Sequence, residues 1–186
     1  IAVLGSAIAW IFIYCTKTCK KAFESVPMPI YVKTTIGGLI LGLIGFGFPI
    51  TRYFGHHEIN ELIGLNLSWD ALLLILGMKI LAISVTVTSG WRGGFIIPLF
   101  FVGTCLGLVL CELFPGLNPT LTWVSCMAAV NACVTRTPVS TTILLSVLTG
   151  FGHFVPILIA SLTGYFLAPR IPFIHSQLKK IDSESA

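Results

Sequence analysis

SGWRGGFIIP, residues 89–98, is a glycine-rich break that carries one arginine between two long apolar segments, Asp70–Thr88 and Pro98–Leu113. The rest of the chain is apolar as well, since 55% of its residues are hydrophobic, only 10% are charged and the mean hydropathy is +0.96. Soluble globular domains carry about 25% charged residues, so this composition excludes an ordinary soluble protein. Non-helical backbone is tolerated at membrane depth only where protein or a water-filled cavity covers it. The break therefore predicts a polytopic membrane protein with broken helices.

The two glycines in the middle of the break lead into the helix that follows. Pro98 falls near the first turn of that helix, where its missing N–H costs least. The N–H groups of Phe95 and Ile96 are then free to point at a ligand, and the lack of a Cβ on Gly93 and Gly94 lets an ion approach the main chain. The partially positive end of a helix favours an anion. Because Gly and Pro are also common in membrane helices, the spacing alone leaves an anion site and a plain kink as equal interpretations.

Apolar segments follow one another along the chain between polar or proline-rich stretches. Charges are absent between Lys33 and Arg52 and between Glu112 and Arg136, which leaves gaps about long enough for spanning or half-spanning helices. The expected spanning segments are Ile1–Thr16, Thr34–Thr51, Asp70–Thr88, Pro98–Leu113 and Phe154–Leu167. Shorter segments predict a re-entrant hairpin, at Thr120–Val134 and Pro138–Leu148, and an interfacial or re-entrant turn at Ile59–Leu67.

Lysines at the ends of segments predict the orientation of the chain. The polar stretch from Lys17 to Lys33 is the expected cytoplasmic loop, and segment parity then places Lys179 and Lys180 on the same side, as the positive-inside rule requires. Residues 179–186 are the expected short polar cytoplasmic tail, in a protein of the plasma (inner) membrane. The chain opens at Ile1 inside an apolar run, without Met or the charged start of a signal peptide, so we expect further sequence upstream.

The polar residues give no pattern typical of a metal, cofactor or catalytic site. The six cysteines lie mostly in apolar segments, where a thiol behaves as a small hydrophobe. His56, His57 and Glu58, in an expected polar loop, and His153 would be the only polar catalysts of a membrane enzyme, and no activated nucleophile accompanies them. The basic residues form no patch interleaved with aromatic residues. We therefore predict no enzymatic activity, no metal, no cofactor and no nucleic-acid partner.

Three cations within or beside the apolar segments allow more than one interpretation. Arg92 directly precedes the glycines and fits either a snorkelling arginine or a source of positive potential for an anion. Arg136 is expected to satisfy backbone carbonyls or to face water. Lys79 lies inside an apolar segment, where an ionisable group is a functional hypothesis by default, but snorkelling is an alternative and the sequence assigns it no role.

Residues 88–107 resemble the characteristic segment of the CLC family of chloride channels and proton-coupled chloride exchangers. In that family a Ser-Gly pair and a Gly-Gly step lead into a Gly-x-Phe-x-Pro motif, and a Gly-x-x-x-Gly follows on the same helix, here Gly103 and Gly107. Residues 112–115 resemble the family's helix end, and residues 132–140 its Arg-x-Pro hairpin. Order and spacing from about Gly37 to Leu178 agree with the second half of the family's membrane domain.

This resemblance implies an all-α antiparallel fold of two halves, with tilted, broken and re-entrant helices. Residues 1–178 would form the C-terminal half of such a transmembrane domain. Family members form homodimers in which each subunit has its own anion path, so the resemblance implies a homodimer in the lipid bilayer. The late helices from Thr120 to Leu167 would contribute to the subunit interface.

The resemblance also implies a site, residue by residue. The expected anion-binding residues are Gly93, Gly94, Phe95, Ile96 and Pro98. Gly94 and Pro98 take the places of the motif's glycine and proline, whereas Ile96 replaces its phenylalanine, a change that keeps the amide but alters packing. Ile174 stands at the place of an inner-gate tyrosine whose hydroxyl touches the anion in the family. The family's gating glutamate and its serine-bearing anion loop belong to the first half, outside this chain.

The function expected from these residues is transport of chloride or a similar small anion, such as another halide, across the membrane. Backbone amides at a helix start would form part of the central site. A non-transporting structural subunit of the membrane is the alternative from another class. Within transport, a passive channel and a proton-coupled exchanger both remain open, because the relay carboxylates expected from the resemblance lie outside this chain.

Overall fold

The computed structural model describes residues 1–52, 56–65, 67–91, 93–170 and 173 of the 186 residues, with the backbone alone at His56 and His57. These residues form α-helices and short 3₁₀ turns and contain no strand, which confirms the all-α prediction. The α-helices are α1 (Ala2–Glu24), α2 (Ile30–Gly47), α3 (His56–Gly64), α4 (Trp69–Thr88), α5 (Ile96–Leu113), α6 (Pro119–Thr135), α7 (Pro138–Thr149) and α8 (Phe154–Phe166). The 3₁₀ turns are η1 (Pro49–Thr51) and η2 (Phe151–His153).

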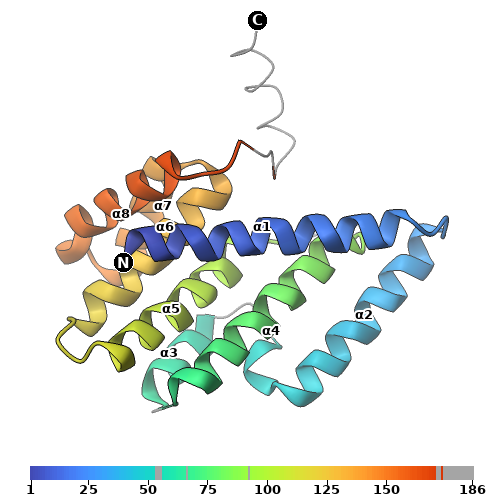
Figure 1. Ribbon diagram of the computed structural model, residues 1–186, viewed down its shortest axis with the longest axis horizontal. Coiled ribbons are helices and arrows are strands. Elements are labelled where there is room, and N and C mark those ends of the chain that lie inside the picture. Colours follow the sequence, from blue (N-terminus) through green and yellow to red (C-terminus); the bar gives the residue numbers. More distant parts are fainter. Residues whose placement is uncertain (53–55, 66, 92, 171–172, 174–186) are drawn as a thin grey trace, which may run out of the picture.

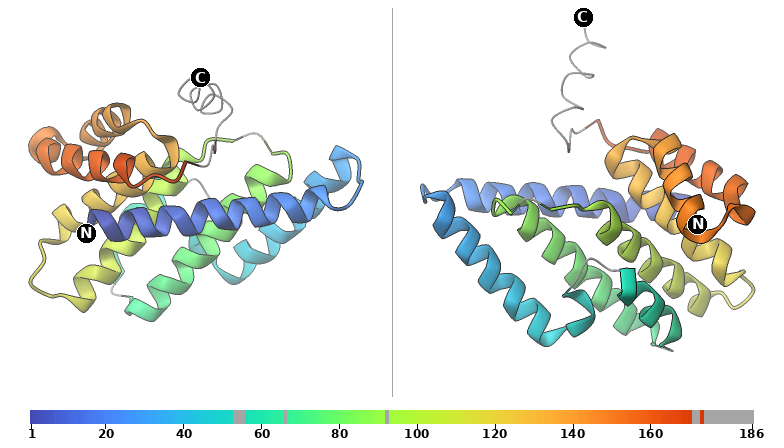
Figure 2. Two further views of the ribbon diagram at one scale, coloured as in Figure 1. Left: turned by 45° about the horizontal axis from the view of Figure 1, so that its top comes forward. Right: turned by 180° about the vertical axis from the view of Figure 1, so that it is seen from behind.

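The helices are arranged along one long axis, which α1 follows. Helices α6, α7 and α8 gather at the end near the N-terminus and α2 lies at the opposite end (Figure 1). Helices α4 and α5 slant across the region between these ends, beneath α1, and both further views keep this order (Figure 2). The junction between α4 and α5, where the glycine-rich break falls, is therefore flanked by α1 and α2.

Four helices, α1, α2, α4 and α5, are long and apolar enough to cross a membrane. This agrees with the prediction of an integral membrane protein. Helix α8 has 13 residues, which gives a length of about 20 Å at a rise of 1.5 Å per residue, short of a hydrocarbon core of about 30 Å. The helix predicted at Phe154–Leu167 is therefore present with nearly the predicted bounds, and its length alone does not reach across a bilayer.

The polar stretch expected as a loop after Thr16 is helical instead. Helix α1 continues through Lys17 to Glu24, and only residues 25–29 connect it to α2. Lys20 and Glu24 lie one turn apart and form an ion pair of 3.8 Å, so the polar residues continue the helix without breaking it. The sequence prediction failed because a change from apolar to polar residues marks the end of a buried segment, not the end of a helix.

His56-His57-Glu58 was also predicted to lie in a polar loop, and these residues instead begin α3. Glu58 is buried, with 8% of its surface exposed. An acidic residue in the first turn stabilises a helix through the helix dipole. The loop prediction missed this start because α3 has only nine residues and follows η1 closely.

Helix α6 is the centre of the packing, because it contacts α1, α5, α7 and α8. All of its residues from Cys126 to Thr135 are buried. Two neighbouring helices present glycines to it: a Cβ on Gly103 or Gly107 of α5 would overlap the backbone of α6 at Met127 or Trp123, and Gly164 of α8 faces the Ala129 carbonyl. Small residues let helix backbones approach closely in lipid, where the hydrophobic effect does not drive helices together.

Prediction on packing. Gly107→Ala should lower the stability of the folded protein by about 1–3 kcal/mol, because a methyl group there overlaps the α6 backbone and the helices must separate. Gly42→Ala on α2 is the matched control, since a Cβ at Gly42 meets no atom within 4 Å. Thermal unfolding of the detergent-solubilised protein, followed by size-exclusion chromatography, measures both changes. Equal midpoints for the two variants would contradict the close approach of α5 and α6.

Candidate functional site

The break between α4 and α5 has defined backbone geometry at both ends. Ser89 caps α4 through its N–H, which donates to the Val85 carbonyl at 2.9 Å. Gly90 then turns the chain with φ +98°, a conformation that glycine adopts without steric cost. Phe95 is the residue before the first turn of α5, and its carbonyl accepts the Leu99 N–H at 3.0 Å.

The start of α5 has the features expected of an exposed helix end. The helix begins at Ile96, so Pro98 is its third residue and lies in the first turn, as predicted. The first N–H groups of an α-helix have no partner within the helix. Since Pro98 has no N–H, the unpaired donors of this end belong to Phe95, Ile96 and Ile97, and Phe95 supplies no side-chain cap. This end can therefore donate several backbone hydrogen bonds to one acceptor.

Helix α2 holds the break in place from the outside. The indole N–H of Trp91 donates to the Thr34 carbonyl at 3.1 Å. Gly37 lies so close to Ser89 that a Cβ on it would overlap the serine side chain. The sequence predicted the helix that is now α2, but it did not predict that this helix contacts the break. The residues in contact, Trp91 with Thr34 and Ser89 with Gly37, are more than fifty positions apart along the chain.

A cleft of about 420 Å³ opens beside the break, between α2, η1, α4 and the start of α5. It brings together four of the five predicted anion-binding residues, Gly93, Gly94, Phe95 and Pro98. Ile96 is not among the described residues that line it, and its side chain is 37% exposed. The other walls come from described residues that no sequence pattern had assigned to a shared site: Leu41, Ile44, Thr51, Arg52, Ala82, Ile83, Thr86, Val87 and Trp91.

The two glycines of the cleft have free space around them. A Cβ built on Gly93 or Gly94 would meet no atom within 4 Å, and neither residue has a positive φ. Neither packing within the described residues nor backbone strain therefore requires glycine here. Gly90 differs, because it combines a positive φ with a Cβ position against Ile30.

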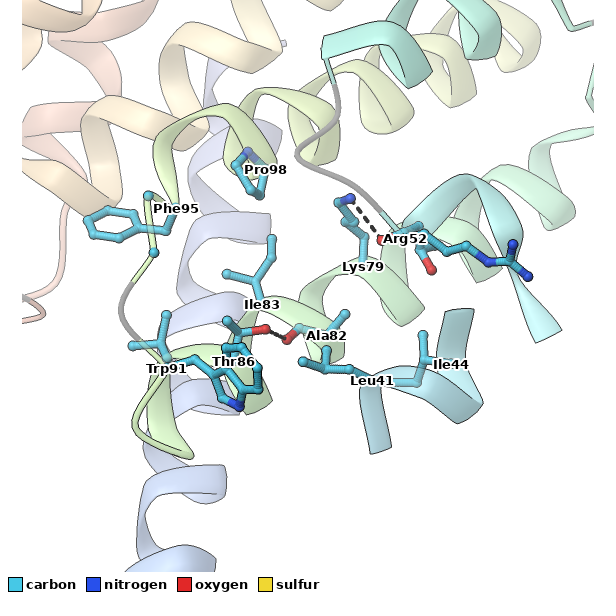
Figure 3. A pocket seen from close by; sticks show the side chains of 14 residues that line it. Leu41, Ile44, Arg52, Lys79, Ala82, Ile83, Thr86, Trp91, Phe95 and Pro98 are labelled. Carbon is cyan, nitrogen blue, oxygen red and sulfur yellow. Dashed lines mark hydrogen bonds between the residues drawn. The ribbon is translucent and has the colours of Figure 1, made fainter. Parts of the chain in front are cut away.

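Both charged residues among the described residues lining the cleft are cations, Lys79 and Arg52. Lys79 is only 2% exposed, and its ammonium donates to the Thr51 carbonyl at 3.1 Å and lies 4.7 Å from the centre of the Phe101 ring. Arg52 is exposed and donates through Nε to the Gly45 carbonyl. Figure 3 shows the Lys79 side chain extending toward η1, whereas the Arg52 guanidinium points away from the other labelled residues. The buried positive charge of the cleft is thus that of Lys79.

The chain returns to this site near its C-terminal end. Phe173 packs edge-on against Phe95 at 5.2 Å between ring centres, and against Phe12 of α1 at 5.3 Å. Two positions singled out in the sequence, Arg92 and the expected inner-gate position Ile174, lie outside the described residues, as does the tail 179–186.

The remaining polar candidates from the sequence, Arg136 and three of the cysteines, lie in hydrogen-bonded or buried surroundings. Arg136 ends α6 with φ +58° and donates to the Pro169 carbonyl, in line with the prediction that it satisfies a backbone carbonyl. Cys105, Cys126 and Cys133 are buried. Within the described part of the chain, no three His, Cys, Asp or Glu side chains are grouped as a metal site requires.

Comparison with known proteins identifies relatives. The family model described as voltage gated chloride channel matches residues 1–169. The chain is 30% identical over 138 residues to the "Putative ion-transport protein YfeO" of Escherichia coli O1:K1, which covers 73% of this chain and 33% of that protein. It is 29% identical over 164 residues to "Uncharacterized protein MJ0305" of Methanocaldococcus jannaschii, which covers 88% of this chain and 41% of that protein. The chain thus spans between a third and about two fifths of the length of these curated relatives.

Prediction on the break. Gly90→Ala should cost about 1–3 kcal/mol of stability, because it forces a residue with a Cβ into a left-handed conformation and against Ile30. Gly94→Ala should change stability by less than about 0.5 kcal/mol, since its Cβ enters free space. Thermal unfolding in detergent compares the two variants. A loss at Gly94→Ala as large as that at Gly90→Ala would show that packing, and not free space, surrounds Gly94.

Proposed function

Because this chain belongs to the voltage-gated chloride channel family, we propose that it transports chloride or a similar small anion across a membrane. The start of α5 contributes to the central anion site through the backbone amides of Phe95 and Ile96. The observation that carries this proposal is the cleft: it joins a helix end with unpaired donors to two glycines with free space, and its charged lining residues among those described are cations.

The chemistry of the proposed site is the replacement of water around an anion. Backbone N–H groups at a helix end donate hydrogen bonds and carry a partial positive charge, so they compensate for part of the lost hydration. Gly93 and Gly94 leave room for the ion to approach the main chain. Transport also requires that the ion leave again, and donors that are neutral amides favour moderate affinity over permanent binding.

Ile96 replaces the phenylalanine expected from the family motif. Its surroundings support the view that this position tolerates different apolar side chains. The amide of Ile96 belongs to the helix start, whereas its side chain is 37% exposed and lies outside the described lining of the cleft. The contribution of residue 96 to anion binding is therefore a backbone contribution. A different apolar side chain at this position would leave the donors unchanged.

The proposed working unit is a homodimer in the plasma membrane with the C-terminus in the cytoplasm. Helix α7 exposes Val139, Ile143 and Val147 along one face, and these residues are four positions apart. Helix α8 exposes a comparable apolar face that includes Val155 and Ile159. Contact with a second copy of the protein would cover part of these faces, and lipid would cover the rest.

Prediction on transport. Gly94→Val in the intact protein, reconstituted in liposomes, should reduce chloride flux at least about tenfold, because its side chain fills the space in front of the α5 amides. The matched control is Gly116→Val, since Gly116 also lies in a loop and a Cβ there meets no atom within 4 Å, but it does not line the cleft. The control should keep the flux of the wild type. Similar losses in both variants would argue against the amide site.

Two outcomes with the wild type bear on the proposal itself. Absence of chloride and fluoride flux under every applied gradient would overturn transport and favour the structural subunit. Anion flux that drives protons uphill across the liposome membrane would identify an exchanger, and flux without proton movement would identify a channel.

A further inference from the structure

Lys79 places an ammonium group in the middle of the apolar helix α4. The apolar sequence of this helix does not explain why a charged residue lies there. It is 2% exposed, so it does not snorkel to a membrane surface. Removing a charge from water is costly, and replacing a buried ion by an apolar residue often leaves a protein equally or more stable. A buried lysine at this position is therefore poorly explained by a need for stability.

The contacts of Lys79 hold its charge at a fixed point. Its Nζ donates to the Thr51 carbonyl of η1 and lies against the face of Phe101 on α5. Glu58 at the start of α3 attracts it electrostatically, but Glu58 is not among the described residues that line the cleft. Of these two residues, Lys79 is the one that lies in the described wall of the cleft.

The position of the charge relates it to the start of α5. Phe101 lies five residues after Ile96, about 7.5 Å along the helix axis. The ammonium beside its ring is therefore about one to two turns from the first amides of α5, and Lys79 and Pro98 both line the cleft. Most of the described lining is apolar, including Leu41, Ile44 and Ile83, so a charge in this wall acts in surroundings of low polarity.

We propose that Lys79 is the residue that sets the anion affinity of the cleft, as a fixed positive charge that acts at a distance and not as a direct ligand. This inference rests on the proposed transport function and adds to it a side chain that determines specificity. The amides supply directional hydrogen bonds, and the lysine supplies a positively charged group in the cleft wall, which neutral amides lack. Together they favour a monovalent anion over a cation or a neutral solute.

The test compares Lys79→Gln, which keeps a hydrogen-bond donor but loses the charge, with Lys79→Arg, which keeps the charge. Chloride flux into liposomes that contain the intact protein gives the apparent KM and the maximal rate, and calorimetry gives chloride binding in detergent. Lys79→Gln should raise KM and weaken binding about tenfold, and Lys79→Arg should stay within about threefold of the wild type. Lys33→Gln, on α2 and outside the described cleft lining, is the matched control and should leave KM unchanged.

A second pair of variants keeps the test decisive if Lys79→Gln fails to fold. Thr86 lines the cleft from α4, so Thr86→Glu adds a negative charge there, and Thr86→Gln adds nearly the same volume without charge. The glutamate should raise KM several-fold above that of the glutamine variant, because it offsets the field of Lys79.

Distinct results overturn the inference and the proposed function. An unchanged KM in Lys79→Gln, or a fall in maximal rate at unchanged KM, would overturn the role of the lysine charge while anion transport stands. Equal KM values for Thr86→Glu and Thr86→Gln would overturn it as well. A wild type that neither binds nor transports chloride would overturn the transport proposal, and the inference with it.

Discussion

The close approach of α6 to its neighbours is the constraint on which the rest of the structure depends. Gly103, Gly107 and Gly164 allow the backbones of α5 and α8 to reach α6 at distances that any Cβ would prevent. In lipid this contact is stabilised by van der Waals packing between close backbones. Apolar side chains gain little free energy by moving from lipid tails to other apolar side chains. The result is an interior helix of 17 residues that is buried from Cys126 to Thr135.

The position of the cleft follows from this arrangement. The C-terminal part of α5 is fixed against α6 through Gly107, whereas its N-terminal end projects toward α4 and α2. The break that precedes α5 is held separately, by the hydrogen bond from Trp91 to Thr34 and by the contact of Ser89 with Gly37. Helix α5 lies against α6 and the break lies against α2, and the cleft opens between the start of α5 and α2.

Polar groups inside the apolar protein are paired in ways that fix neighbouring elements. The Thr16 hydroxyl of α1 and the Ser84 hydroxyl of α4 form a buried hydrogen bond of 3.0 Å. Lys79 joins η1 to α4 in the same way. A polar group in a low-dielectric interior is costly when it has no partner, so each such pair determines where its two elements meet.

The class of protein, the break and the helix that follows it could all be predicted from the amino-acid sequence. Composition and charge-free gaps are local properties that lipid imposes on any spanning chain, and the first-turn place of Pro98 follows from its missing N–H. The helical continuation of α1 through the lysines and the start of α3 at His56 were missed, because polarity reports burial and not backbone conformation. Which glycines are required by packing and which have free space became visible in the folded protein, because a Cβ at Gly107 would overlap α6 whereas one at Gly94 would meet no atom within 4 Å. The tertiary structure alone placed Lys79 of α4 and Thr51 of η1 in one wall with the α5 start, because contacts between residues far apart in the chain come from helix packing, which no local pattern encodes.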